Sequence, residues 1–399
     1  MSAQIAVLAT TPTDSNTEGF LPAAVRRGAQ VILLTAYPEV HRAAYAGTPL
    51  AEHVTVVECR VEDHREALTA LAGQRVAAVF SGSDHLQMQT ALVADFLGLP
   101  GKDWRVAWRV KNKALMREHL AAAGVDKVWS LQLRPDDPIP LSPMPFPVVV
   151  KPREGVASED VELCSDERAL ATCVSSIRRR RPGAVLVVEE FLPGELRTLE
   201  TLGDGERRHV LGGFCTELGK LPYFIEERMH FDPAPDPEVV AQVLTALDAL
   251  GVGFGICHTE FVVHEGRARL IEVNYRAIGD QCDLMLPDLI DVPIFDLALG
   301  VHCGEALPEA LPTRTDGRAR LEYLCARRSG TLVRAPGSVD RVEDGVTLAY
   351  RPLRELGVTA NVTMTNRDFL GVVRARGLDQ ARVDAVVAGF VADNEWRIA

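Results

Sequence analysis

Short apolar runs alternate with helical patterns over the first quarter of the chain, and this alternation constrains the fold more than any other feature. The segments between the runs, such as residues 20–27 and 64–71, have the spacing of amphipathic helices. Strands that alternate with helices predict a doubly wound parallel sheet of the α/β class. The turn after the first run, Thr10–Asp14, lacks the G-x-G-x-x-G pattern, so a classical dinucleotide site is not indicated. The four runs that we predict as buried parallel strands are residues 5–9, 31–35, 54–57 and 77–80.

The chain has 399 residues, which is more than one hydrophobic core usually holds. One helix is predicted from Val106 to Ala123, because Gly124 follows its apolar pattern as a C-cap signal. A Pro-rich loop, residues 135–147, then leads into a strand. Later helices are predicted at residues 237–250, 291–300 and 378–392. We expect four segments, an N-terminal parallel α/β domain, two subdomains and a strand-rich extension of the second subdomain, at residues 1–105, 106–185, 186–310 and 311–399.

Composition excludes several classes of protein. The formal net charge of −12 disfavours nucleic-acid binding, which needs a basic surface. The one basic cluster, Arg178–Arg181, is interpreted as the solvated end of a helix that Pro182 stops. Eight scattered cysteines form no CxxC pair, which favours free thiols in a reducing cytosol. No apolar stretch approaches the length of a membrane span, so we expect a soluble cytoplasmic protein without nucleic-acid or membrane partners.

A strand that ends at Lys151 carries the first chemical motif. Residues 147–150 fit a hydrophobic strand, and the chain then turns through Gly155 and small residues up to Ser158. A lysine at a strand end can neutralise a phosphate, and small residues let backbone N–H groups approach phosphate oxygens closely. An ordinary surface lysine before a proline is the alternative.

Three acids follow the next hydrophobic strand, residues 185–188. Glu189 and Glu190 stand at the strand end, and Glu195 follows a turn. Carboxylates at these positions can accept hydrogen bonds from an exocyclic amine and from ribose hydroxyls, while the backbone near Leu192 can supply further contacts. An exposed acidic turn is the alternative.

A predicted hairpin over residues 257–276 carries the sharpest motif. The two-residue period of a strand places Glu272, Asn274 and Arg276 on one face, and strand pairing can bring Glu260 beside them. Two carboxylates and an amide oxygen make a hard-oxygen site that suits Mg²⁺. The arginine can bind a transferring phosphoryl group. Acids on a solvated sheet face are the alternative.

In their order along the chain, these motifs resemble the ATP-grasp superfamily, and within it the branch of L-amino-acid ligases and carnosine-synthase-like enzymes. The resemblance extends over residues 75–335 and begins at Gly98–Gly101. It continues at Lys111–Arg117, which looks like the family's DK-x-x-x-R helix. It implies that a pre-ATP-grasp domain precedes a fold of two subdomains, with the small subdomain over residues 106–185 and the large one over 186–310.

The resemblance implies a role for each residue of a nucleotide site. Lys113 and Lys151 match the two lysines that grip the phosphates of ATP. Glu189 and the backbone near Leu192 match the adenine site. Glu195 matches the acid that binds the ribose.

The hairpin residues match the metal and phosphoryl sites of the family. Glu260, Glu272 and Asn274 match the ligands of Mg²⁺, which Mn²⁺ can replace. Asn274 also belongs to the expected nucleotide site. Arg276 matches the arginine that binds the acyl phosphate. Arg276, Glu272 and Lys151 are therefore the expected catalytic residues.

Two further substrate contacts leave alternatives open. The segment Pro222–Glu226 looks like the branch's P-x-F-x-E segment near the metal and the substrate, although Glu227 could serve in place of Glu226. His258 either orients Glu260, contacts substrate or has a structural role.

Three positions depart from the family pattern. Asn112 stands where the family has Asp, and Val156–Ser158 stands where glycine is common. The second departure bears on the mobility of the loop that covers the phosphates. Tyr275 replaces the proline of the E-x-N-P-R pattern, which can mark an unusual substrate pocket.

The resemblance implies an ATP-dependent ligase that activates a carboxylate as an acyl phosphate and couples it to an amine, with release of ADP and phosphate. Dipeptide, siderophore or other natural-product biosynthesis is a plausible setting, with small-molecule substrates as partners. Dimers are common among such enzymes, so a homodimer is an open alternative. Other functions are a bicarbonate-activating, carboxylase-like enzyme, although no biotinyl-lysine segment of the A-M-K-M type occurs, and a nucleotide-binding regulatory protein without turnover.

Overall fold

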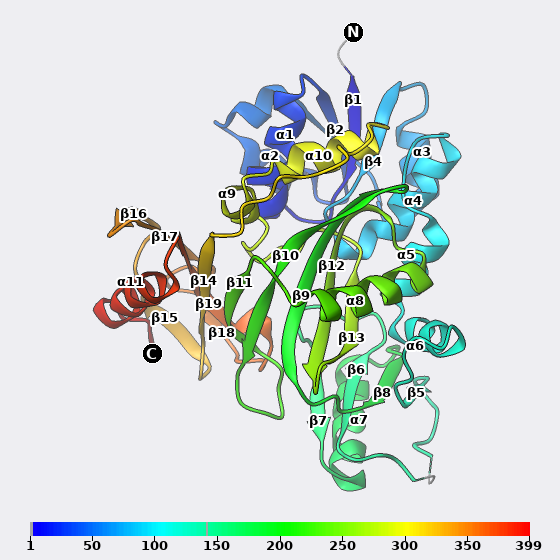
Figure 1. The fold of residues 1–399 in the computed structure, drawn as a ribbon, viewed down its shortest axis with the longest axis vertical. Coiled ribbons are helices and arrows are strands. Elements are labelled where there is room, and N and C mark those ends of the chain that lie inside the picture. The colour runs from blue at the N-terminus through cyan, green and yellow to red at the C-terminus, as the bar shows by residue number, and fades with distance from the viewer. Residues whose placement is uncertain (1–2, 141–142) are drawn as a thin grey trace.

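A computed structural model describes residues 3–140 and 143–399 of the chain. Residues 141 and 142 of the predicted Pro-rich loop lie outside this description. Figure 1 shows a large twisted sheet between the N-terminal domain, drawn in blue, and a smaller sheet near the opposite end. The C-terminal strands, in orange and red, continue one edge of the large sheet.

The N-terminal domain is the predicted parallel sheet, with strand order β3-β2-β1-β4. This confirms the α/β class and the positions of all four predicted strands, although the strand at the β3 edge of the sheet is mostly not buried as predicted. The strands are β1 (Gln4–Leu8), β2 (Gln30–Thr35), β3 (Val54–Glu58) and β4 (Val76–Phe80). The helices around them are η1 (Ser15–Phe20), α1 (Leu21–Arg26), α2 (Pro38–Tyr45), η2 (Pro49–Glu52), α3 (His64–Ala70), η3 (Asp84–Leu86) and α4 (Gln87–Phe96).

The strand order reverses direction at β1. The chain adds β2 and β3 on one side of β1 and then crosses to place β4 on the other. In open α/β sheets, ligands bind at the carboxyl ends of the strands where the order reverses. The loops that follow β1 and β4 therefore form a natural ligand site.

The single helix predicted over residues 106–123 is wrong. The chain forms two helices, α5 (Trp104–Lys111) and α6 (Lys113–Ala122), because Asn112 leaves the helical conformation with ψ near 100°. The Asn112 side chain caps α6 by accepting a hydrogen bond from the Leu115 backbone N–H at 3.2 Å. The break places Lys113 at the first turn of α6, beside the large sheet.

The smaller sheet is antiparallel, with strand order β5-β8-β6-β7. Its apolar face packs on one helix, through residues such as Val148, Val188 and Leu170. The strands are β5 (Ser130–Leu133), β6 (Val148–Pro152), β7 (Glu162–Cys164) and β8 (Leu186–Glu190), and the helix is α7 (Glu167–Arg180).

The large sheet has nine antiparallel strands in the order β13-β12-β9-β10-β11-β14-β19-β17-β16. The predicted hairpin is confirmed, since β12 pairs with β13 in antiparallel register. The strands are β9 (Glu195–Asp204), β10 (Arg208–Leu218), β11 (Glu226–Asp232), β12 (Phe254–His264), β13 (Arg267–Asn274), β14 (Arg318–Cys325), β16 (Val339–Glu343), β17 (Val346–Pro352) and β19 (Phe369–Gly377). The accompanying elements are α8 (Pro237–Leu250), α9 (Leu286–Ile290), α10 (Ile294–His302), η4 (Asn366–Asp368), α11 (Gln380–Asp393) and a small sheet of β15 (Gly330–Arg334), β18 (Thr359–Ala360) and β20 (Arg397–Ile398).

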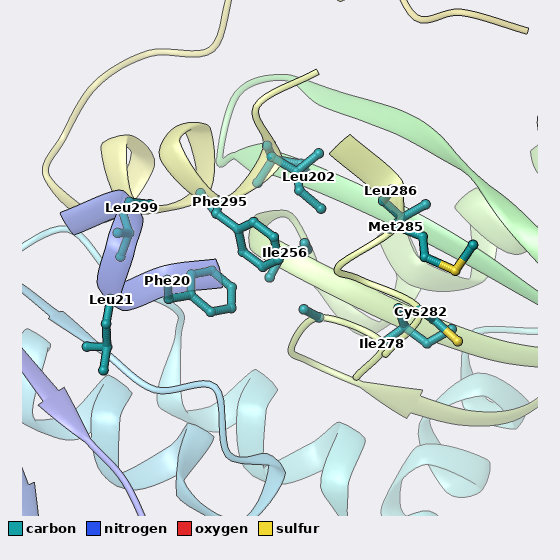
Figure 2. Close-up of a cluster of buried hydrophobic side chains, with 14 of the residues drawn as sticks. Phe20, Leu21, Leu202, Ile256, Ile278, Cys282, Met285, Leu286, Phe295 and Leu299 are labelled. Atoms are coloured by element: carbon teal, nitrogen blue, oxygen red, sulfur yellow. The ribbon is translucent and has the colours of Figure 1, made fainter. Parts of the chain in front are cut away.

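The helix predicted over residues 291–300 occurs as α10, but it begins later. Asp291 adopts a left-handed conformation that ends α9, and Pro293 precedes the first turn of α10. This helix packs the N-terminal domain onto the large sheet. Figure 2 shows Phe20 against Phe295 of α10, with Ile256 of β12 close by. The continuous core fixes the N-terminal domain relative to the hairpin.

Candidate active site

Three adjoining cavities run from the space between the two antiparallel sheets to the N-terminal domain. Their volumes are about 320, 70 and 420 Å³, and we call them the first, second and third cavity. Glu226, Glu260 and Glu272 line both the first and the second cavity. Arg276 and Asp280 line both the second and the third. The cavities are therefore parts of one continuous cleft, which is the candidate active site.

The third cavity lies where the strand order of the parallel sheet reverses. Its wall includes residues 9–16, which follow β1, and residues 82–85, which follow β4. A small ligand is expected at this place in a parallel sheet. The cavity reaches the large sheet through Arg276.

Apolar side chains form much of the wall of the first cavity. Val149, Leu192, Val262 and Ile271 are among them. Leu192 is buried and packs on Val262 in a small apolar cluster. A wall of this kind suits the flat face of a heterocycle such as adenine.

A buried ion triad borders the first cavity. The Glu189 carboxylate accepts hydrogen bonds from Arg117 at 3.0 and 3.1 Å, and the Lys151 ammonium lies 2.7 Å away. Burial raises the pKa of Glu189, but the charges of Arg117 and Lys151 outweigh it and bring the pKa to about 2. Both carboxylate oxygens of Glu189 therefore bind protein cations. This geometry favours a role in positioning Lys151 over direct contact with an adenine.

The second lysine links α6 to the hairpin. The Lys113 ammonium donates to Glu272 at 2.8 Å and to the Gly155 carbonyl at 3.2 Å. Burial lowers the pKa of Lys113, but Glu272 more than offsets this and raises it. Lys113 and Lys151 both line the first cavity. The structure thus brings together the two lysines that the sequence singled out.

The hairpin register places the predicted metal ligands side by side. Glu260 pairs with Glu272, and His258 pairs with Asn274. The Asn274 amide donates to Glu260 at 3.2 Å. The two carboxylates and the amide all line the second cavity.

His258 lies between two carboxylates. Its ring nitrogens are 2.8 Å from Glu200 and 3.3 Å from Glu260. Burial lowers the pKa of His258, but the two carboxylates raise it to about 10, so the imidazole is charged at neutral pH. Of the three roles considered for His258, this contact favours orientation of Glu260.

The donor set fits a hard divalent cation. Glu260, Glu272 and Asn274 present oxygen atoms, which Mg²⁺ prefers, and they share one small cavity. Within residues 3–140 and 143–399, no group of three or more His, Cys, Asp or Glu side chains surrounds one metal position. A cation held here would take its other ligands from phosphate oxygens and water, as is usual for Mg²⁺ in phosphoryl transfer.

The cavity walls favour Glu226 over Glu227. Glu226 lines the first and second cavities. Glu227 lines none of the three, and its carboxylate pairs with Arg327 at 2.7 Å. Burial, with repulsion from Glu260 and Asp280, raises the pKa of Glu226 to about 8.

Arg276 and Tyr275 point to different environments. Arg276 lines the second and third cavities, and its guanidinium donates to the Ala277 carbonyl at 2.6 Å. Tyr275 lines none of the three, and its hydroxyl accepts from the Phe254 backbone N–H at 3.0 Å. The prediction that Tyr275 marks an unusual substrate pocket is therefore wrong, because the ring is buried as a structural support.

Glu195 lies away from the cavity wall. Its side chain is 73% exposed and pairs with Arg197 at 2.7 Å, whereas Glu190 lines the first cavity. The ribose role of Glu195 stays a prediction.

Four residues that line the cleft or contact its lining residues received no role from the sequence. Arg117 lies in a recognised helix, but its partner Glu189 is distant in sequence. Glu200 lies inside the strand β9, where an alternating pattern does not reveal its contact with His258. Asn366 and Arg367 line the second and third cavities, respectively, from the C-terminal region, which carries no recognisable motif.

Comparison with known families and proteins identifies one domain in the chain and several proteins of similar sequence. Residues 144–284 match the ATP-grasp domain. The chain is 29% identical over 348 residues, or 81% of its length, to an uncharacterized protein, y4rH, of Sinorhizobium fredii (strain NBRC 101917 / NGR234), and covers 69% of that protein. It is 27% identical over 301 residues to carnosine synthase 1 of Homo sapiens. That match covers 67% of this chain and only 36% of the synthase.

Solved structures share the fold over the whole chain. A crystal structure of L-amino acid ligase from Bacillus licheniformis superposes with a TM-score of 0.82 at 19% identity, covering 100% of this chain and 99% of the ligase. Phosphoribosylglycinamide synthetase from Anaerococcus prevotii gives a TM-score of 0.72 at 12% identity, with 100% of both chains covered. At these identities the likeness shows the ATP-grasp fold.

None of the helices among residues 3–140 and 143–399 combines the length and the apolar character that crossing a membrane requires.

Proposed function

This chain carries an ATP-grasp domain over residues 144–284, and on that premise we propose that it is an ATP-dependent carboxylate–amine ligase. It would form an amide through an acyl phosphate and release ADP and phosphate. The finer resemblance to the L-amino acid ligase and carnosine synthase 1 supports amino-acid substrates.

The continuity of the three cavities carries the proposal. The first has the apolar wall and the lysines that suit a nucleotide, and the third lies at the ligand position of a parallel sheet. The second joins them and holds Glu260, Glu272, Asn274 and Arg276. A phosphoryl group can therefore pass from a nucleotide to a small molecule without leaving the cleft.

The cationic side chains would hold the triphosphate. Lys113 and Lys151 would bind its phosphates, and Glu189 keeps Lys151 in place. Glu260, Glu272 and Asn274 would hold Mg²⁺. When bound, Mg²⁺ neutralises charge that develops on the phosphate oxygens.

The reaction would take two steps. A carboxylate oxygen attacks the terminal phosphorus of ATP, a new P–O bond forms, and the bond to ADP breaks. The amine nitrogen then attacks the acyl carbon, the bond to phosphate breaks, and the amine gives up its proton. Arg276 would stabilise the oxygen charge in both steps, since it lies where the second and third cavities join.

The size of the third cavity bears on the alternative of bicarbonate activation. A volume of about 420 Å³ is far larger than bicarbonate requires. It lies within the range of pockets that hold small organic ligands. The cavity therefore favours an organic carboxylate, an amine or both.

A trapping experiment tests the proposal. The purified protein is incubated with ATP, Mg²⁺, single amino acids and hydroxylamine, and both hydroxamate and nucleotide products are measured. We expect a hydroxamate with release of ADP and phosphate. Stoichiometric AMP and pyrophosphate would contradict the acyl-phosphate route, and ATP binding without turnover over a broad panel of acids would favour the regulatory alternative.

A further inference from the structure

A segment of the C-terminal region reaches across the cleft to the small subdomain. We call residues 363–368 the clamp segment and residues 154–160 the covering loop. The Asn366 backbone N–H donates to the Ala157 carbonyl at 3.2 Å. The Arg367 guanidinium donates to Glu159 at 2.8 Å, across 208 positions of sequence. Two adjacent residues of the clamp segment therefore hold the covering loop at two points.

The covering loop has a conformation that needs support. Ala157, Ser158 and Asp160 have φ values of 56°, 53° and 57°, in the left-handed region that glycine normally occupies. This is the stretch where the sequence has small residues in place of the family's glycines. Side chains that disfavour this conformation would open the loop unless contacts elsewhere stabilise it.

The clamp segment is itself rigid. The buried Asp368 carboxylate accepts hydrogen bonds from the backbone N–H groups of Thr363 at 3.0 Å, Met364 at 2.6 Å and Thr365 at 3.3 Å. Thr365 and Asp368 also form a reciprocal capping box. A segment fixed in this way can impose its position on a strained loop.

The same segment also contacts the cleft. The Asn366 side-chain oxygen accepts a hydrogen bond from the Glu226 backbone N–H at 3.1 Å. Asn366 lines the second cavity, and Arg367 lines the third. Val156 lines all three cavities, and Ala157 lines the second and third. The covering loop is thus held directly over the place where the phosphates are expected.

The arginine cluster supports the loop from its other side. Arg181 pairs with Glu159 at 2.5 Å and with Asp160 at 2.7 Å. Arg180 pairs with Asp160 at 2.5 Å. The end of α7 is therefore more than a solvated helix terminus, and Glu159 lies between one cation from the small subdomain and one from the clamp segment.

We propose that Asn366 and Arg367 are positioning residues that hold the covering loop closed over the terminal phosphates of ATP. This inference rests on the proposed function. A closed loop excludes water from the terminal phosphoryl group, so that a carboxylate in the third cavity accepts it. When the loop is released, ATP binds less tightly and water competes for the phosphoryl group, which yields ADP without amide.

The test replaces Arg367 with Gln and measures the ratio of ADP formed to amide formed at saturating substrates. We expect this ratio and the KM for ATP to rise several-fold, while the thermal midpoint changes little. Arg367→Lys should restore part of the coupling, because it keeps one charge for Glu159. A pair of this exposure contributes up to about fivefold in an equilibrium. Arg334→Gln is the matched control, since Arg334 and Arg367 are both 63% exposed and both pair with a glutamate at 2.8 Å.

A second measurement does not depend on ligase turnover. A glutamate-specific protease can cut the covering loop after Glu154 or Glu159, and a non-hydrolysable ATP analogue should protect it in the wild type and in Arg334→Gln. The bond after Glu154 remains cleavable in every variant, and Arg367→Gln should lose its protection. Glu159→Gln should lose at least as much, because it also breaks the pair with Arg181, and the double variant should lose no more than Glu159→Gln. Equal protection of all variants, or an unchanged ADP-to-amide ratio in Arg367→Gln, would overturn the inference. Absence of ATP binding in the wild type would instead refute the proposed function.

Discussion

The ion triad at the first cavity can be tested by asking how much the buried Glu189 carboxylate stabilises the fold through Arg117 and Lys151. Glu189→Gln removes one charge at nearly constant volume and leaves Arg117 and Lys151 buried without their shared carboxylate. Glu190→Gln is the control at the next position. The Glu190 side chain is 28% exposed, against 4% for Glu189, and pairs with Arg269 at 3.1 Å.

Glu189→Gln should lose several kcal/mol of folding free energy, as both the pKa of Glu189 and the cost of breaking a buried ion pair indicate. The pKa of Glu189 falls from 4.5 to about 2, which corresponds to about 3 kcal/mol of folding free energy. Breaking a buried ion pair by removing one partner costs about 3–5 kcal/mol, because the remaining charge stays buried. The pair of Glu190 with Arg269 is partly exposed and should contribute about 1 kcal/mol or less.

Thermal and urea unfolding at several pH values measure how much folding free energy the Glu189 and Glu190 variants lose relative to the wild type. Because folding depresses the pKa of Glu189, its contribution is present above pH 4.5 and is lost as the pH falls towards 2. The wild type should therefore exceed Glu189→Gln in stability at pH 7, and the gap should narrow below pH 4.5. Equal losses in the Glu189 and Glu190 variants, or a gap that does not change with pH, would refute the assignment of a stabilising buried triad.

Three further substitutions test two residues of the cleft and one buried lysine outside it. Glu272→Gln should abolish ADP release at saturating Mg²⁺ while the protein stays folded, with a lower thermal midpoint because Lys113 loses its partner; near-normal turnover would contradict a metal role. Lys151→Met should weaken ATP binding about tenfold or more in a nucleotide titration, and unchanged affinity would mean that the lysine does not contact phosphate. Burial lowers the pKa of Lys102 to about 7, so its contribution to wild-type stability should rise between pH 7 and 10.5. This rise in stability with pH should be absent from unfolding curves of Lys102→Met. Its persistence in that variant would show that Lys102 is not the group whose pKa folding lowers.

Regular patterns made the fold readable from the sequence. The apolar runs of the two central strands, β1 and β2, are buried on both faces, so each stands out against the helices that flank it. The hairpin was readable because polar and apolar residues alternate along it and because Gly266 marks its turn, where the structure gives that glycine a positive φ. The break at Asn112 was missed because the apolar spacing continues across it, while only the side-chain cap reveals it.

The site was predicted in its residue types and only partly in its contacts. Glu260, Glu272 and Asn274 share one face of a hairpin, so local periodicity was enough to bring them together. The partners of the charges depend on tertiary packing, which no local pattern encodes. Arg117 meets Glu189 across 72 positions. Contacts of that kind decide whether a carboxylate can bind a ligand or is already engaged.

The position of Arg276 explains why the core and the site cannot be considered separately. Arg276 lies two residues after the end of β13, which carries Glu272 and Asn274, and the chain then continues into α9 and α10. Phe295 of α10 packs edge-to-face on Phe20 of the N-terminal domain, with ring centres 4.8 Å apart (Figure 2). One continuous segment therefore joins the predicted metal ligands to the wall of the third cavity. Any shift of α10 on the N-terminal domain would also move the third cavity relative to the hairpin, so this apolar contact helps to keep the two parts of the cleft in register.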